Sequence, residues 1–366
     1  MTDDVLPPDA DPAPATAPIP TSEEIRMRTL VTGGAGFVGS HLVEHLLHLG
    51  DDVVVLDDLS TGSARNLAAV ADHPRLQMIH GSILNPQTVR SAMATCDRVF
   101  HLAAAVGVKL IVEQPLRGLR INIHGTENVL TAAIEQEASV LLVSTSEVYG
   151  KNTADRLRED SDRILGDPLL SRWTYAGAKG IDEAFAKAYC DQEDLDVSIV
   201  RLFNTVGPRQ TGRYGMVFPN LVGQALRGQP LTVFGDGRQT RCFSAVEDVV
   251  PAMVRIERDP RARGEAYNLG GAREISILDL AQEIVRTLDS RSEISLIPYA
   301  QAYAPGFEDM RRRVPDNSKA HALVGYEPHT SLTTTIMRVA ADLLSRERLG
   351  SDAMPLAGAG AFRGVI

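Results

Sequence analysis

The stretch Thr32-Gly33-Gly34-Ala35-Gly36-Phe37-Val38-Gly39 decides the fold of this chain. It follows an apolar run over residues 28–32 and precedes a segment, residues 40–49, whose apolar positions recur at helical spacing. Glycines at such a junction permit a tight turn and let the backbone approach a pyrophosphate, while the start of the helix supplies N–H donors. The stretch therefore predicts a dinucleotide-binding turn, whose contacts we expect at Gly33, Gly36, Phe37, Val38 and Gly39.

The next predicted strand ends in an acid at the distance that such a turn requires. Residues 52–56 form a continuous β-branched run, which is typical of a strand buried on both faces. Asp57 follows this run, and a carboxylate there accepts hydrogen bonds from both adenosine ribose hydroxyls and repels a 2′-phosphate, which favours NAD over NADP. The adjacent Asp58 is an alternative ligand, and Arg65 is the one nearby residue that argues for NADP.

Strands and helices alternate along the first part of the chain. Further strands are predicted at residues 76–79, 98–102, 140–143 and 197–202, with helices at 87–94, 115–135 and 176–192. This order predicts an α/β fold, a Rossmann-type doubly wound parallel sheet. Later elements are mixed, with helices at 218–226, 246–256, 277–288 and 332–346 and a strand at 231–234.

These patterns predict four regions of the chain. We expect a disordered leader over residues 1–26 and an NAD-binding Rossmann domain over residues 27–206. A smaller mixed α/β substrate subdomain is expected over residues 207–349, with some segments returning to the first domain. A flexible tail is expected over residues 350–366.

Composition narrows the classes of function. The net charge is −10 and no basic run stands out, which argues against nucleic acid or an anionic membrane as the main partner. No apolar stretch has the length of a membrane span and the first residues do not resemble a secretory signal, so a cytoplasmic location is expected. Three widely separated cysteines, Cys96, Cys190 and Cys242, predict neither a disulfide framework nor a metal site.

Tyr175 and Lys179 lie four residues apart, on one face of a predicted helix. A nearby cation favours the phenolate, so such a tyrosine can act as a base at neutral pH. Upstream, Thr145, Ser146 and Glu147 come at the end of a predicted strand, where they could hold a substrate hydroxyl against that base. A tyrosine and lysine at this spacing often decorate a solvated helix, but the accompanying motifs favour catalysis.

With these pieces in order, the chain resembles the extended short-chain dehydrogenase/reductase family, whose members act on nucleotide sugars. The resemblance covers roughly residues 28 to 340. Besides the glycine turn, it rests on Phe100–Ala104, Asn122–Thr126, Ser144–Gly150, the Tyr175/Lys179 pair, Arg201–Arg209, Gly235–Phe243 and Arg313–Asp316. It implies NAD as the cofactor, a UDP-sugar as the substrate and a homodimer formed through the helix that carries Tyr175.

The resemblance also implies residue roles. Tyr175 would take the proton of the sugar 4-hydroxyl, Lys179 would hold the nicotinamide ribose and lower the pKa of the tyrosine, and Thr145 would hydrogen-bond the same hydroxyl. The cofactor would also meet Ser82, Ile83, Leu102, Ala103 and Ala104. Ser82 stands where the family usually has an acid for the adenine amino group, which weakens that contact. The sugar diphosphate would lie against Asn204, Arg209, Arg241 and Arg313.

The choice of reaction depends on two motifs. Thr145-Ser146-Glu147 and Gln239-Thr240-Arg241 match the pattern of glucuronate decarboxylases, which favours UDP-glucuronate decarboxylase giving UDP-xylose or its 4-keto precursor. Arg241 would place the carboxylate or reprotonate carbon 5 through water, and Glu147 would orient the sugar or polarise the carboxylate. Lys109 could contact the carboxylate or face solvent, in a loop unlike that of the better-known decarboxylases. The alternatives are a UDP-glucose or UDP-glucuronate 4-epimerase, a 4,6-dehydratase and a non-catalytic NAD-binding module.

Overall fold

The computed structural model describes residues 27–106, 114–213, 215–302 and 310–348. Structural statements below concern these ranges. The predicted leader, the predicted tail and Lys109 lie outside the described residues.

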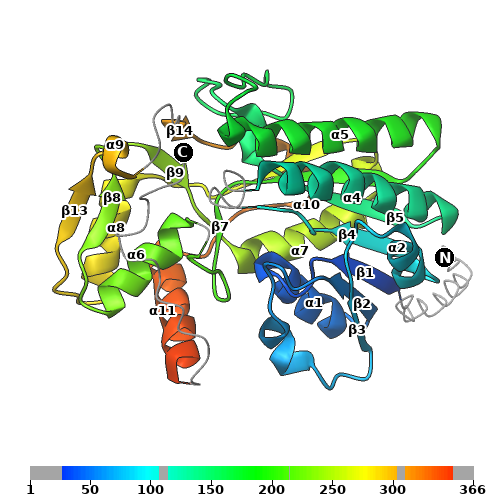
Figure 1. Ribbon diagram of the computed structural model, residues 1–366, viewed down its shortest axis with the longest axis horizontal. Helices are drawn as coiled ribbons and strands as arrows, with labels where there is room; N and C mark the ends of the chain where they lie inside the picture. Colours follow the sequence, from blue (N-terminus) through cyan, green and yellow to red (C-terminus); the bar gives the residue numbers. More distant parts are fainter. Residues whose placement is uncertain (1–26, 107–113, 214, 303–309, 349–366) are drawn as a thin grey trace, which may run out of the picture.

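A seven-stranded parallel sheet forms the centre of the molecule (Figure 1). Its order is β11-β6-β5-β4-β1-β2-β3. The strands are β1 (Arg28–Thr32), β2 (Asp52–Asp57), β3 (Leu76–His80), β4 (Arg98–His101), β5 (Ser139–Thr145), β6 (Val197–Leu202) and β11 (Ala266–Leu269). The chain order reverses beside β1, which has β2 on one side and β4 on the other, and dinucleotides bind at the carboxyl ends of strands at such a point. The predicted doubly wound fold is confirmed.

Helices cover both faces of this sheet (Figure 1). The helices α1 (Phe37–His48) and α7 (Val246–Glu257) enclose one apolar core, and α2 (Pro86–Met93), α4 (Pro115–Glu135) and α5 (Thr174–Gln192) enclose the other. Residues 53–56 of β2 are all buried because the two layers cover both of their faces.

A second group of elements packs around its own core beside the large sheet (Figure 1). It contains α6 (Val217–Leu226), α8 (Ile277–Thr287) and α11 (Leu332–Arg348), with the paired strands β8 (Leu231–Phe234) and β13 (Ile294–Ile297). The helix α9 (Tyr299–Ala302) follows β13, and α10 (Ser318–Val324) returns to contact α7 and β11. Part of the chain beyond residue 207 therefore joins the larger sheet.

Very short strands join the two groups. The three-stranded sheet β12-β9-β14 contains β12 (Glu274–Ser276), β9 (Thr240–Cys242) and β14 (Arg312–Arg313), and β7 (Thr205–Val206) pairs with β10 (Ser244–Ala245). The strands β9 and β14 are parallel, with Arg313 opposite Arg241. This register brings together two arginines that are far apart in the sequence.

Single turns of 3-10 helix complete the described fold: η1 (Ala64–Val70), η2 (Ser146–Tyr149), η3 (Ser171–Trp173) and η4 (Pro260–Ala262). Two of them, η2 and η3, carry site residues. Within the described ranges, no helix combines the length and the apolar character needed to cross a membrane.

Candidate active site

The glycine turn between β1 and α1 leaves no space for side chains. A Cβ on Gly39 would lie 2.2 Å from the carbonyl oxygen of Gly33, and a Cβ on Gly33 would lie 2.8 Å from the backbone nitrogen of Ala103. Gly33 also has a φ of +72°, which a glycine adopts without strain. Since α1 begins at Phe37, the N–H groups of Phe37 and Val38 have no acceptor within the helix. The turn therefore fits a pyrophosphate.

The segment after β4 closes the other side of this turn. Two residues of this segment donate hydrogen bonds to Thr32. Leu102 N donates to its carbonyl oxygen at 3.1 Å, and Ala103 N donates to its hydroxyl at 3.2 Å. Residues 102–104 are thus fixed beside the glycine turn, where cofactor contacts were expected.

Asp57 stands at the carboxyl end of β2 with its carboxylate turned to the glycine turn. Its two oxygens accept hydrogen bonds from Ala35 N at 2.9 Å and from Leu59 N at 2.8 Å. Burial raises the pKa of Asp57, and these two N–H groups act against the rise. The carboxylate lies where an adenosine ribose is expected, whereas Asp58 caps its own turn through Ser60 N. Ribose binding by either acid stays a prediction.

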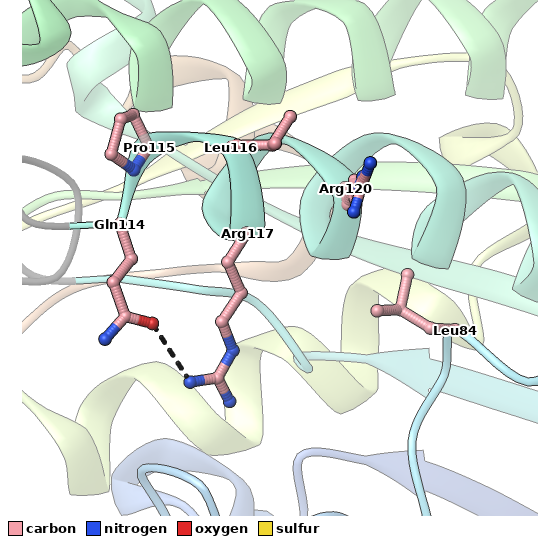
Figure 2. A pocket seen from close by; sticks show the side chains of 6 residues that line it. All are labelled: Leu84, Gln114, Pro115, Leu116, Arg117 and Arg120. Carbon is pink, nitrogen blue, oxygen red and sulfur yellow. Dashed lines mark hydrogen bonds between the residues drawn. The ribbon is translucent and has the colours of Figure 1, made fainter.

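A surface hollow lies next to the predicted adenine contacts. Ile83 packs so tightly on α4 that a Cβ on Gly125 would lie 2.4 Å from its Cδ1, and Leu84 N donates to the Ser82 hydroxyl at 3.3 Å. Figure 2 shows the hollow, which is lined by Leu84, Gln114, Pro115, Leu116, Arg117 and Arg120. Its lining does not include Thr145 or Tyr175, so the hollow borders the predicted adenine side and not the catalytic cluster.

The catalytic cluster forms where β5 ends and α5 begins. Thr145 is the last residue of β5, and its hydroxyl accepts a hydrogen bond from Glu147 N at 3.2 Å, which starts η2. Burial raises the pKa of Tyr175, the carboxylates of Glu147 and Asp182 raise it further, and the Thr145 hydroxyl lowers it. The net shift is upward because burial and negative charges act on the phenol here, and the expected lowering by Lys179 stays a prediction.

Lys179 has a partner that sequence reasoning missed. Its ammonium lies 2.8 Å from the carboxylate of Asp182, and both side chains are almost completely buried. The only signal in the sequence was an acid three residues after the lysine, a common spacing on solvated helices.

Two arginines hold Glu147. Its Oε1 accepts a hydrogen bond from Arg313 at 2.6 Å and its Oε2 accepts one from Arg172 at 2.7 Å, while Arg313 also donates to the Ser146 hydroxyl at 3.2 Å. Burial by itself raises the pKa of Glu147, but the two guanidiniums outweigh burial and lower it to about 2. The sequence analysis missed Arg172, whose position three residues before Tyr175 was the only signal.

Of the four residues expected on the diphosphate, Asn204, Arg241 and Arg313 lie on or against β9 and β14, whereas Arg209 contacts α1. Arg241 and Arg313 are neighbours in the β9–β14 register, and both are buried. Arg209 instead pairs with Glu44 of α1 at 2.5 Å. Asn204 donates to the Cys242 carbonyl at 3.3 Å and has a φ of +40°, a strained conformation for a residue other than glycine. Diphosphate binding by these residues stays a prediction.

Metal ligands do not gather in the described ranges. No three His, Cys, Asp or Glu side chains there are arranged to hold a metal ion.

A doubly wound sheet with a tight glycine turn at its switch point, and with the half-buried Tyr175 and the buried Lys179 on α5, defines a dinucleotide-binding enzyme of the Rossmann class. The chain also matches the family model described as GDP-mannose 4,6 dehydratase over residues 30–339. It therefore belongs to that family, within the extended short-chain dehydrogenases/reductases, and the predicted resemblance is confirmed.

Relatives and solved structures agree with this assignment. The chain is 39% identical over 308 residues to a UDP-N-acetyl-alpha-D-glucosaminuronate decarboxylase of Bacillus cytotoxicus, covering 84% of this chain and 94% of the relative. It is 38% identical over 307 residues to UDP-glucuronic acid decarboxylase 1 of Danio rerio, covering 84% and 70%. The structure of UDP-glucuronic acid 4-epimerase from Bacillus cereus with UDP-glucuronic acid and NAD superposes with a TM-score of 0.78 at 29% identity, covering 87% and 99%.

Proposed function

We propose that the protein is an NAD-dependent UDP-glucuronate decarboxylase that gives UDP-xylose, UDP-4-keto-pentose or both. The observation that carries this proposal is the carboxylate of Glu147, held ionised by Arg172 and Arg313 directly beside Thr145 and Tyr175. The two guanidiniums of this cluster suit the carboxylate of a UDP-uronate, a group that a neutral UDP-hexose lacks. The two relatives described above are both named as decarboxylases of UDP-uronates, which supports this choice over an epimerase or a dehydratase.

NAD fits the residues at the switch point. The glycine turn has space and donors for the pyrophosphate, and the fixed carboxylate of Asp57 suits an adenosine ribose without a 2′-phosphate. Bound there, NAD⁺ would take up the two electrons that leave carbon 4 of the sugar. Lys179 would meet the hydroxyls of the nicotinamide ribose.

Tyr175 and Thr145 act at the sugar 4-hydroxyl. Tyr175 accepts the hydroxyl proton as carbon 4 becomes a ketone, and the hydroxyl of Thr145 fixes the position of the same oxygen. Burial and the carboxylates of Glu147 and Asp182 raise the pKa of Tyr175 and so oppose the phenolate that this step requires, whereas the positive charge of bound NAD⁺ would favour it.

Glu147 and Arg313 act at the carboxylate. A uronate with a ketone at carbon 4 is a β-keto acid, so the bond between carbons 5 and 6 breaks, its electron pair moves toward the carbonyl oxygen, and carbon dioxide leaves. The ionised Glu147 disfavours a second carboxylate nearby and so favours its loss as a neutral molecule. Arg313 orients the departing group, and a proton then adds to carbon 5. Arg241, the strand neighbour of Arg313, would hold the diphosphate or the carboxylate.

Mass spectrometry tests the reaction. The protein is incubated with NAD⁺ and UDP-glucuronate, with UDP-N-acetylglucosaminuronate, and with UDP-glucose as a substrate that has no carboxylate. Loss of the mass of carbon dioxide from a UDP-uronate is expected, and Tyr175→Phe should abolish it. Conversion at equal mass would instead indicate the 4-epimerase, and unchanged turnover by Tyr175→Phe would exclude the proton transfer described above.

We also propose a cytoplasmic homodimer that joins through α4 and α5. These helices pack side by side at the outer face of the molecule (Figure 1), and each exposes a large apolar side chain, Leu116 at 59% and Ile181 at 44%. Light scattering during gel filtration should give twice the chain mass, and Ile181→Glu should shift it toward the monomer. Cell fractionation tests the location.

A further inference from the structure

We propose that Asp182 is a positioning residue for the proton transfer at Tyr175. It holds the ammonium of Lys179 through a buried ion pair and sets the net charge that faces the phenol. This inference rests on the proposed function for the role of Tyr175, while the ion pair itself is independent of any substrate.

The geometry of the pair distinguishes it from an ordinary helix-surface pair. The Lys179 ammonium and the Asp182 carboxylate lie 2.8 Å apart, with only 2% and 0% of their side chains exposed. A buried ammonium without a counter-ion loses its proton readily, because burial disfavours the charged form. On the same helix, Lys187 and Asp191 form a pair with both side chains 55% exposed, where solvent provides that stabilisation instead.

A line of buried polar groups continues from Asp182 toward the glycine turn. Burial raises the pKa of Asp182, and the ammonium of Lys179 and then the Thr126 hydroxyl act against the rise; this hydroxyl lies 3.0 Å from Nε2 of His101. The other ring nitrogen of His101 lies 2.7 Å from the hydroxyl of Thr32, which ends β1. Burial, with a smaller effect of Lys179, lowers the pKa of His101 to about 3, so the ring stays neutral. Asp182 therefore supplies the negative charge in this line.

The charge of Asp182 also acts on Tyr175. The titratable groups around the two residues are Glu147 of η2, His101 of β4, and Lys179 and Glu183 of α5. After burial, the carboxylates of Glu147 and Asp182 are the causes that raise the pKa of Tyr175. Glu183 is neutralised by Arg201 at 2.8 Å. Replacing Asp182 by asparagine should therefore make Tyr175 easier to deprotonate and leave the Lys179 ammonium without its 2.8 Å partner.

The first experiment follows Lys179 directly. Because the sequence contains few lysines, NMR spectra of protein with labelled lysine are sparse, and Lys179→Arg assigns the signal. We expect the Lys179 ammonium signal of Asp182→Asn to change its chemical shift and to exchange its protons with solvent faster than in the wild type, because the buried ion pair is lost. The control Asp191→Asn removes the exposed partner on the same helix and should leave the Lys179 signal unchanged.

The second experiment follows Tyr175 through the pH dependence of single-turnover reduction of bound NAD⁺ by UDP-glucuronate. Asp182→Asn should move the acidic limb to lower pH by roughly half a unit or more, and Asp182→Glu should restore it. Thr126→Val keeps both charges and should shift the limb in the same direction by less.

The outcomes separate positioning from mere support of the fold. If Asp182→Asn lowers only the free energy of unfolding, and both the Lys179 signal and the acidic limb match the wild type, the proposal is wrong. If Asp182→Asn does not fold, Thr126→Val decides, and an unshifted acidic limb there overturns the proposal. Absence of turnover with any UDP-uronate would refute the proposed function, and the Lys179 signal would still decide whether Asp182 holds the ammonium.

Discussion

Glu147 shows how a single residue acquires a function from partners that the local sequence does not contain. One arginine comes from η3 and the other from β14, near the end of the described chain. Together they keep the Glu147 carboxylate ionised, whereas a solvated glutamate is ionised at neutral pH without any partner. The chemistry of Glu147 therefore depends on contacts that only the complete fold brings together.

Replacing Glu147 by glutamine removes this charge and retains its shape. Two buried guanidiniums then lack a carboxylate, and the decarboxylation step should slow by about 100-fold or more. The measurement is release of carbon dioxide from UDP-glucuronate at saturating NAD⁺. Glu135→Gln is the matched control, because Glu135 pairs with Arg90 in an exposed bidentate arrangement remote from the cluster. Equal rates for the two variants would show that the charge of Glu147 is not used.

The same residue should make stability depend on pH. Its folded-state pKa of about 2 lies below its ordinary value of 4.5, so its contribution is present above pH 4.5 and is lost as the pH falls toward 2. Between pH 5 and pH 3 the wild type should lose on the order of 1–2 kcal/mol more unfolding free energy than Glu147→Gln. Urea unfolding at each pH measures the difference, and parallel pH profiles would contradict it.

At the scale of elements, two helical glycines have opposite roles. A Cβ on Gly39 of α1 would lie 2.2 Å from a backbone oxygen, whereas a Cβ on Gly177 of α5 would meet nothing within 4 Å. Gly39→Ala should therefore displace the start of α1 and weaken NAD⁺ binding by about tenfold or more. Gly177→Ala should stabilise the protein by about 1 kcal/mol, because alanine is the better helix former. Calorimetric titration with NAD⁺ and urea unfolding measure both; equal NAD⁺ affinity of the two variants would contradict the prediction.

The elements that sequence alone predicted are those with a long periodic pattern. The strands β1, β2 and β6 and the helices α4 and α5 lie within two or three residues of their expected bounds, because the strands are buried along most of their length and each helix buries one face. The strand β11 was missed: it has four residues and contains Asn268, whose side chain binds Tyr149 and not an apolar neighbour.

The residues of the candidate site also fall into two groups, those that a local sequence motif predicts and those that it does not. The glycine turn, Asp57 and the Thr145–Tyr175 cluster come from local motifs, and the structure brings the cluster together. Arg172 and Asp182 have no motif of their own, and the juxtaposition of Arg241 with Arg313 requires the two-residue strand β14. No periodic signal extends over an element that short.

At the scale of the whole molecule, the carboxyl and amino ends of the strands in the large sheet have different roles. The carboxyl ends of β1, β2, β4 and β5 carry the glycine turn and the catalytic cluster. The amino ends carry a buried ionic network centred on Arg98, which is 1% exposed. Its guanidinium bonds Asp51 before β2, Thr29 of β1 at 2.8 Å and Glu257 of α7 at 2.7 Å. The network fastens α7 to the sheet at the edge remote from the chemistry.

This separation predicts that a substitution at the amino ends of the strands changes the stability of the protein and leaves its catalysis unchanged. Arg98→Met leaves two buried carboxylates without their partner, so the free energy of unfolding should fall by about 3–5 kcal/mol. The kcat and KM for UDP-glucuronate, measured at a temperature where the variant is folded, should stay within about twofold of the wild type, because the network touches no residue of the site. Arg90→Met removes an exposed pair and should leave the free energy of unfolding close to that of the wild type. A folded Arg98→Met protein with greatly reduced kcat would contradict this independence. It would show that packing at the amino ends of the strands helps to position the catalytic residues at their carboxyl ends.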